Sequence, residues 1–122
     1  MKNSQEDPIF VVDDDQGLLE SFDAMLGDEY LLKVLNDGRQ ARDLLSHHTP
    51  KLIFLDLHMP KPDGLEVLAT MRKMGLSAKV VIVTALAQER FRESAEQLGV
   101  YRYLNKPLDV DEIMEIAQTV VH

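Results

Sequence analysis

The sequence predicts a single α/β domain, built as a doubly wound sheet of five parallel strands flanked by five helices. Five short apolar runs alternate with five amphipathic segments along the 122 residues. Each run is apolar at consecutive positions, as a strand requires when helices cover both faces of its sheet. The length suits one domain, so we expect residues 8–122 to form it after a flexible tail over residues 1–7. The pattern alone leaves the order of the strands open.

The first strand and helix are predicted at the start of this domain. The apolar run at residues 9–12 stops at three consecutive aspartates, residues 13–15. The apolar residues after them fall on one stripe of a helix: Leu18, Leu19, Phe22, Met25 and Leu26. Asp15 is placed to cap this helix, and Gly27 is placed to end it.

The second strand is predicted over residues 30–35, and Asp37 with Gly38 is predicted to form the turn after it. A helix then carries Ala41, Leu44 and Leu45 at helical spacing. It ends near His47 and His48, which are adjacent and therefore do not converge on one ligand. We expect these histidines to lie at the helix C-terminus rather than in a Zn²⁺ site.

The third strand is predicted over residues 52–55, and this run again stops at an aspartate, Asp56. Three residues then break the chain: Pro60, Pro62 and Gly64. Asp63 is placed to cap the following helix. That helix carries Leu65, Val67, Leu68 and Met71 on its apolar side.

The last two units repeat the pattern. The fourth strand, residues 80–83, ends at Thr84, and its helix carries Phe91, Ala95 and Leu98 before Gly99. The fifth strand, residues 101–104, ends just before Lys106. The final helix is predicted over residues 109–122, with Ile113, Ile116, Ala117 and Val120 at helical spacing.

Polar residues stand where four of these strands end. In an open α/β sheet, ligands bind beyond the carboxyl ends of the strands, so Asp13, Asp14, Asp56, Thr84 and Lys106 are expected to share one cleft. Each residue alone has a structural explanation as a cap, a turn former or a solvated side chain. Carboxylates held together repel one another, and a divalent cation relieves that repulsion. A lysine and a hydroxyl beside them suit a phosphoryl group.

Four motifs in order and spacing resemble those of the bacterial two-component response-regulator receiver domain, over residues 9–121. They are VVDDD at 11–15, LDLHMP at 55–60 with DG at 63–64, VTA at 83–85, and YLNKP at 103–107. The resemblance implies a flavodoxin-like sheet with strand order 2-1-3-4-5. It also implies a phosphorylation-activated signalling switch that catalyses only its own phosphorylation and slow dephosphorylation, so we do not class it as an enzyme.

The resemblance assigns roles to individual residues. Asp56 matches the phosphoacceptor, and a carboxylate nucleophile depends on positioning and charge neutralisation. Asp13 and Asp14 match the acidic pair that holds Mg²⁺, or alternatively Mn²⁺, together with Asp56 and the backbone carbonyl of His58. Lys106 matches the residue that pairs with the phosphoryl oxygens.

Thr84 and Tyr103 match the switch pair, which couples the phosphoryl group to the face formed by the fourth helix, fifth strand and fifth helix. A static tyrosine at a strand end is the alternative. Three positions depart from the commonest pattern of the family: His58, Leu86 and residues 61–62. We expect the side chains of His58 and Leu86 to alter the lifetime of the acyl phosphate.

Composition limits the partners. The net charge of −8 argues against direct binding of nucleic acid, no apolar run can span a membrane, and the absence of cysteine fits a cytoplasmic protein. The resemblance implies a sensor histidine kinase or a histidine phosphotransfer protein as phosphodonor, and a downstream effector that the sequence does not identify. The last helix has no lysine or arginine, which favours a monomer or weak dimer over a salt-bridged one. A stand-alone regulator and one domain of a larger regulator or hybrid kinase remain equally compatible.

Three other functions fit this sequence less well. An aspartate-nucleophile phosphatase requires a second acid two residues after the nucleophile, where this chain has His58. A flavin-binding domain of flavodoxin type requires a small-residue phosphate loop after the first strand, where residues 13–15 are aspartates that repel a phosphate. A degenerate receiver that serves only as an interaction module requires the loss of a key residue, and all are present.

Overall fold

A computed structural model describes residues 8–85 and 89–121 of the protein. The strands are β1 (Ile9–Val12), β2 (Leu32–Leu35), β3 (Leu52–Leu55), β4 (Lys79–Thr84) and β5 (Arg102–Asn105). The helices are α1 (Gln16–Leu26), α2 (Gly38–Leu45), α3 (Gly64–Lys73), α4 (Glu89–Gln97) and α5 (Val110–Val120). All strands are parallel, in the order β2-β1-β3-β4-β5. This confirms the predicted fold class, and it confirms the strand order that the resemblance implied.

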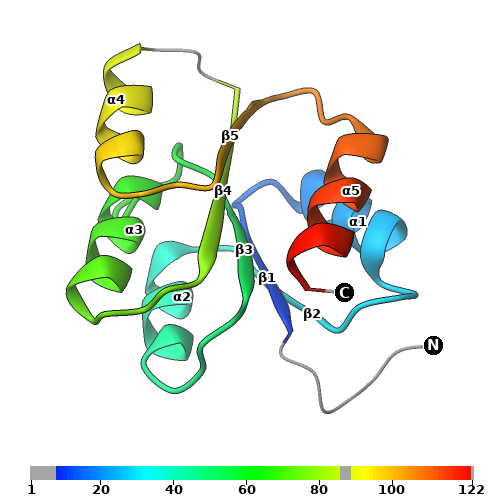
Figure 1. The fold of residues 1–122 in the computed structure, drawn as a ribbon, viewed down its shortest axis with the longest axis horizontal. Helices are drawn as coiled ribbons and strands as arrows, with labels where there is room; N and C mark the ends of the chain where they lie inside the picture. The colour runs from blue at the N-terminus through cyan, green and yellow to red at the C-terminus, as the bar shows by residue number, and fades with distance from the viewer. Residues whose placement is uncertain (1–7, 86–88, 122) are drawn as a thin grey trace.

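Helices cover both faces of the sheet, with α1 and α5 on one side and α2, α3 and α4 on the other (Figure 1). Alternate side chains of β1 serve the two layers: Phe10 and Val12 pack toward α2 and α3, whereas Ile9 and Val11 pack toward α1 and α5. Every residue of β1 and β3 is buried, which explains why these runs are apolar at consecutive positions.

The caps predicted from aspartates are confirmed. Asp15 Oδ1 accepts hydrogen bonds from the backbone N–H groups of Gly17 at 3.0 Å and Leu18 at 3.4 Å, at the start of α1. Asp63 Oδ1 accepts from the N–H of Glu66 at 3.0 Å, and the Glu66 carboxylate accepts from the N–H of Asp63 at 3.1 Å. This capping box fixes the start of α3 immediately after the loop that carries Asp56.

Two local predictions are wrong. The second strand begins at Leu32 rather than at residue 30, because the N–H of Tyr30 donates to the carbonyl of Leu26 and so extends the turn that closes α1. Asp37 does not form a turn with Gly38 but caps α2, which begins at Gly38. A Cβ atom at Gly38 would lie 2.1 Å from the carbonyl oxygen of Pro62, so glycine is required there by close packing.

The remaining boundaries differ from the prediction by about one residue, except that α5 stops at Val120. His47 and His48 are exposed just beyond α2. The expected tail over residues 1–7 lies outside the described residues. No helix in the described ranges combines the length and the apolar character that a membrane span needs.

Candidate functional site

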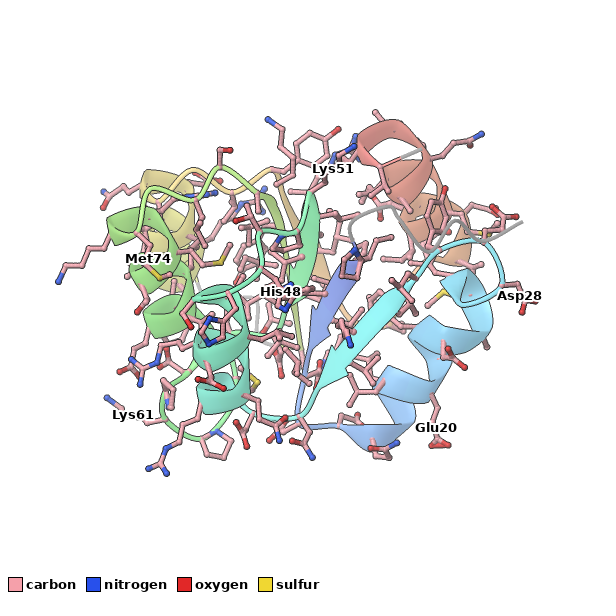
Figure 2. The ribbon with its side chains drawn as sticks, turned by 90° about the horizontal axis from the view of Figure 1, so that it is seen from below. Glu20, Asp28, His48, Lys51, Lys61 and Met74 are labelled. Atoms are coloured by element: carbon pink, nitrogen blue, oxygen red, sulfur yellow. The ribbon has the colours of Figure 1, made fainter. Side chains whose placement is uncertain are left out.

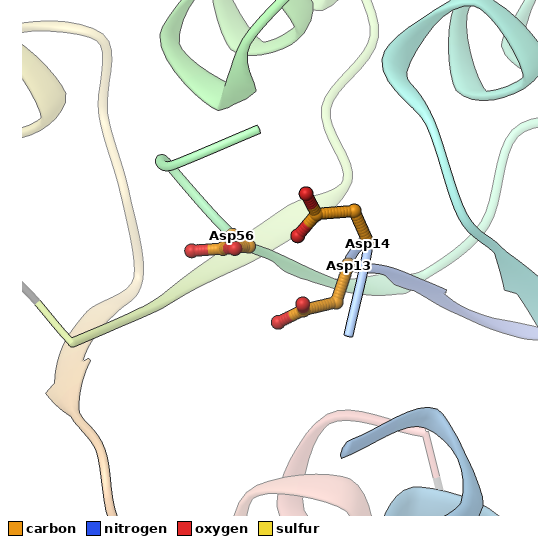
Figure 3. Close-up of side chains that lie close together, drawn as sticks. All are labelled: Asp13, Asp14 and Asp56. Atoms are coloured by element: carbon orange, nitrogen blue, oxygen red, sulfur yellow. The ribbon is translucent and has the colours of Figure 1, made fainter. Parts of the chain in front are cut away.

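Three carboxylates from two neighbouring strands meet at the carboxyl edge of the sheet (Figure 3). Val12 and Leu55 are paired in register, so the residues after them leave β1 and β3 at the same level. Asp13, Asp14 and Asp56 each offer one carboxylate oxygen, and these oxygens lie within 4.8 Å of one another. Asp13 and Asp56 are buried, with 1% and 3% of their surface exposed, whereas Asp14 is exposed.

Lys106 brings one positive charge to this cluster. Its backbone N–H donates to the carbonyl of Thr84 at 2.8 Å, which ties the end of β5 to the end of β4. Its side-chain Nζ lies 3.1 Å from Asp13 Oδ2 and 3.8 Å from Asp56 Oδ2. Lys106 therefore contacts both Asp13 and Asp56, and these residues, which are far apart in the sequence, share one cleft as predicted.

The environment of Asp56 favours its neutral form. Burial raises the pKa of Asp56 from 3.8 to about 6, and the charges of Asp13 and Asp14 act in the same direction. The backbone N–H of His58, 3.1 Å from Asp56 Oδ1, and the charge of Lys106 oppose this rise of the pKa. Because ionisation of Asp56 is costly at this buried position, a cation bound beside it would stabilise its charged form.

The pKa of Asp13 is also raised by burial and lowered by its polar neighbours. Burial raises its pKa, and the N–H of Asp15, 2.9 Å from Asp13 Oδ1, together with Lys106 lowers it. Asp13 Oδ2 is buried, and the ammonium group of Lys106 at 3.1 Å is its only partner in the described part of the chain. A buried carboxylate oxygen with one partner can accept a further ligand.

This donor set fits a hard divalent cation. Three carboxylates lie together, and the one lysine beside them contacts only Asp13 and Asp56, which leaves an excess of negative charge at the site. Mg²⁺ prefers oxygen ligands and commonly uses few carboxylates, with water or phosphate oxygens completing its shell. A cation beside Asp13 Oδ2 would be a further partner for that oxygen and would offset the repulsion between Asp13 and Asp56.

Space for a further group lies along the loop that follows Asp56. A pocket of about 230 Å³ is bounded by the loop after β3, by Thr84 at the end of β4, and by Phe91 of α4. His58 and Lys61 belong to its wall, so two of the positions that depart from the family pattern lie there. Leu86, the third, lies outside the described residues. Thr84 itself is fully buried.

Tyr103 lies on β5, next to β4, with Ile82 as its partner in register. It packs partly buried against the α2–α4 side of the core. The guanidinium carbon of Arg92 on α4 lies 5.5 Å from the centroid of the Tyr103 ring, and Arg92 Nε is 3.1 Å from Glu96 Oε1. No motif in the sequence marks Arg92 as a functional residue.

Gly64 has a packing role that its place in the sequence, as a chain breaker and as part of the DG motif, does not reveal. A Cβ atom there would lie 2.1 Å from the carbonyl oxygen of Asp56 and 2.8 Å from Cα of Leu57. Only glycine lets the start of α3 approach the backbone that carries Asp56. The pair Asp63-Gly64 thus fixes the distance between the α3 cap and the site.

Comparisons with known proteins agree with this geometry. The family model of the response regulator receiver domain matches residues 9–118. Response regulator MprA of Mycolicibacterium vanbaalenii is 35% identical over 107 residues, which cover 87% of this chain and 46% of MprA. Sporulation initiation phosphotransferase F of Bacillus subtilis is 31% identical over 108 residues, 88% of this chain and 87% of that protein.

A solved structure shows the same fold. The signal receiver domain of an HD domain-containing protein from Pseudomonas fluorescens superimposes with a TM-score of 0.88 and is 26% identical, over 95% of this chain and 94% of that one. The chain spans about half the length of MprA. It belongs to the family of response regulator receiver domains, which are signalling switches activated by phosphorylation.

Proposed function

We propose that Asp56 accepts a phosphoryl group from the phosphohistidine of a sensor histidine kinase or a histidine phosphotransfer protein, in a reaction that requires Mg²⁺ or Mn²⁺. The observation that carries this proposal is the contact of Lys106 with two buried carboxylates that lie beside Asp14. The Bacillus subtilis relative is named a phosphotransferase, which supports phosphoryl transfer as the chemistry of this fold.

In the proposed reaction, a carboxylate oxygen of Asp56 forms a new P–O bond while the donor's P–N bond breaks. The bonding pair leaves with the imidazole nitrogen, which then takes a proton. Asp13, Asp14 and Asp56, with the backbone carbonyl of His58, would hold the cation. When bound, this cation neutralises phosphoryl oxygens and offsets the negative charge that would repel the incoming donor.

The residues of the chain supply the remaining stabilisation. Lys106 is already placed between Asp13 and Asp56, so its ammonium group can turn to the phosphoryl oxygens without a large movement of the backbone. Thr84 would donate its hydroxyl to another phosphoryl oxygen. Because catalysis here consists of positioning and charge neutralisation, the protein would promote its own phosphorylation and slow dephosphorylation but no turnover of an external ester.

The output is proposed to pass through Thr84 and Tyr103. A phosphoryl group adds nearly two negative charges and three acceptor oxygens, which draw the Thr84 hydroxyl toward Asp56. Tyr103 would then turn into the space beside β4 and reshape the face formed by α4, β5 and α5, which an effector would recognise. We propose a cytoplasmic monomer or weak dimer, and an acyl phosphate whose lifetime depends on His58 and Leu86.

The proposal is tested with a small phosphodonor that contains a P–N bond, phosphoramidate. Incubation with Mg²⁺ should add one phosphoryl group, detected by intact-protein mass, and chelation of the metal should prevent it. Asp56→Asn should abolish the modification, whereas Asp15→Asn, which keeps the helix cap, should not. A modified Asp56→Asn protein would contradict the proposal.

A further inference from the structure

Charge is distributed unevenly along this acidic chain. Residues 33–61 contain five of the thirteen lysines and arginines but only three of the twenty-one aspartates and glutamates. The remaining residues hold eight basic and eighteen acidic side chains. A chain with a formal net charge of −8 therefore contains one segment whose formal charge is positive.

The structure places most of these cations around α2. Lys33 is on β2, and Arg39 and Arg42 are on α2; all three are exposed. We name these three residues the α2 surface. Lys51 lies elsewhere, because its carbonyl accepts from the N–H of Lys79 and it lines a pocket with Lys79 and Tyr101. Figure 2 shows β2 and α2 on the near side of the molecule, with His48 labelled beside them. Arg39 and Arg42 are three residues apart, so they share one side of the helix, while Ala41 and Leu45 are buried.

Lys33 belongs to the same side of the sheet as α2. It is paired in register with Phe10, which packs in the same layer as Ala41. Its neighbour Val34 faces the other layer, where it lines a pocket with residues of α1. The alternation of a strand thus directs Lys33 toward the side on which α2 lies.

The cations of the α2 surface have no internal partner in the described part of the chain. None of the three forms an ion pair within 4.0 Å there, although Lys61, close in sequence, approaches Glu66 at that distance. The nearby acids are mostly engaged: Asp56 is buried in the site, and Asp37 accepts a hydrogen bond from the N–H of Gln40. Asp43 alone is an exposed carboxylate between residues 33 and 61.

We propose that the α2 surface binds a short acidic segment of a partner protein. The surface has three exposed cations and one exposed carboxylate, Asp43, so it is complementary to negative charge. The rest of the molecule is strongly acidic and repels the same ligand, which directs its approach to this one side. A helix of eight residues is roughly 12 Å long, which matches a short peptide segment.

The small size of the α2 surface favours a short acidic protein segment over larger polyanions. Nucleic acid or an anionic membrane would extend beyond the α2 surface and meet the acidic remainder of the molecule. The surface also lies at the β2 edge of the sheet, whereas β5 is at the opposite edge. An acidic partner on α2 would therefore leave the face of α4, β5 and α5 accessible to an effector.

The test uses poly-L-glutamate as the probe and the unphosphorylated ¹⁵N-labelled protein, so its failure leaves the role of Asp56 untouched. Amide shifts on titration should concentrate in β2 and α2, between residues 33 and 45, and the affinity should fall as NaCl is raised. Arg39→Glu/Arg42→Glu should weaken binding roughly tenfold. Arg39→Gln/Arg42→Gln, which only removes charge, should have an intermediate effect and controls for misfolding.

The matched control is Lys73→Glu/Lys79→Glu, which reverses two exposed cations outside the α2 surface. This variant should change the affinity less than about twofold. Equal loss in both double variants, or shifts spread over the whole surface, would overturn the proposal. Tighter binding to oligothymidine or to phosphatidylserine vesicles than to poly-L-glutamate would overturn it too, as would salt-sensitive self-association in place of binding.

Discussion

The ammonium group of Lys106 lies 3.1 Å from Asp13 Oδ2 and is the only partner of that buried oxygen among the described residues. The same ammonium group is 3.8 Å from Asp56 Oδ2. One cation thus partly neutralises two buried carboxylates and fully satisfies neither. The site is short of positive charge, and this shortage underlies both its expected affinity for a divalent cation and its expected reactivity.

Removal of that single cation should destabilise the protein. Lys106→Met keeps the length of the side chain but leaves two buried carboxylates without a counter-charge, which should cost about 1–3 kcal/mol of unfolding free energy at pH 8. Urea unfolding in the presence of a chelator measures this cost. Lys73→Met, at an exposed position on α3, should change the unfolding free energy by less than about 0.5 kcal/mol. Equal effects of the two substitutions would contradict the account.

The raised pKa of Asp56 makes the stability depend on pH. The folded pKa of about 6 exceeds the ordinary value of 3.8, so the folded state binds the proton more tightly and loses stability as pH rises from about 4 to about 6. Asp56→Asn removes this ionisation and retains an oxygen that can accept from the N–H of His58. We expect a gain on the order of 2 kcal/mol above pH 7 that disappears below pH 4. A difference between the two proteins that is constant with pH would contradict this assignment.

Binding of Mg²⁺ should distinguish Asp14 from Asp15. Asp14 is exposed and belongs to the carboxylate cluster, so Asp14→Asn should weaken Mg²⁺ binding about tenfold or more while leaving the metal-free stability nearly unchanged. Asp15→Asn preserves the α1 cap and should not affect the metal. Isothermal titration calorimetry measures both. The wild-type affinity should also fall as pH drops through about 6, because protons compete for Asp56.

Most of the fold followed from local chemistry. Runs of consecutive apolar residues marked the strands, and Asp15 and Asp63 marked helix starts because a carboxylate after a strand satisfies free N–H groups. Asp37 was misassigned because the pair with Gly38 is also a common turn sequence. A turn at these two residues and a helix cap at Asp37 are both compatible with the local sequence. The close packing of Gly38 against Pro62, from a distant loop, accompanies the helix cap.

The site was predictable in composition but not in geometry. The rule that strand ends of an α/β sheet share one edge was enough to bring Asp13, Asp56, Thr84 and Lys106 together. The pairing of Asp13 Oδ2 with Lys106 depends on side-chain geometry that no sequence pattern encodes. The contact of Arg92 with Tyr103 depends on how α4 lies against β5, which long-range packing decides.

The closeness of Gly64 to the Asp56 backbone gives a direct packing test. Gly64→Ala would place a Cβ atom 2.1 Å from the Asp56 carbonyl oxygen, so the backbone must shift. We expect a loss of about 1–3 kcal/mol in unfolding free energy and slower phosphorylation at saturating donor. Gly17→Ala, whose Cβ meets only a carboxylate oxygen of the exposed Asp15 at 3.3 Å, should be nearly neutral. Comparable losses in both variants would refute the packing argument.

Arg92 and Tyr103 should be energetically coupled. A guanidinium group 5.5 Å from the ring centroid at a partly exposed position predicts a coupling of about 0.5–1 kcal/mol. A double-mutant cycle of Arg92→Gln and Tyr103→Leu, followed by chemical unfolding, measures it. Glu93 with Tyr103 supplies the control cycle, which should show no coupling. Additive effects of Arg92→Gln and Tyr103→Leu would show that the contact contributes nothing.

The central claim is that Asp56 itself carries the phosphoryl group. Borohydride reduces an aspartyl phosphate to homoserine, so reduction of the phosphorylated protein followed by peptide mass spectrometry locates the modified residue. We predict homoserine at position 56, formed only when both Mg²⁺ and the phosphodonor have been present. Homoserine at position 13 or 14, or its absence from a protein that has gained a phosphoryl group, would contradict the account.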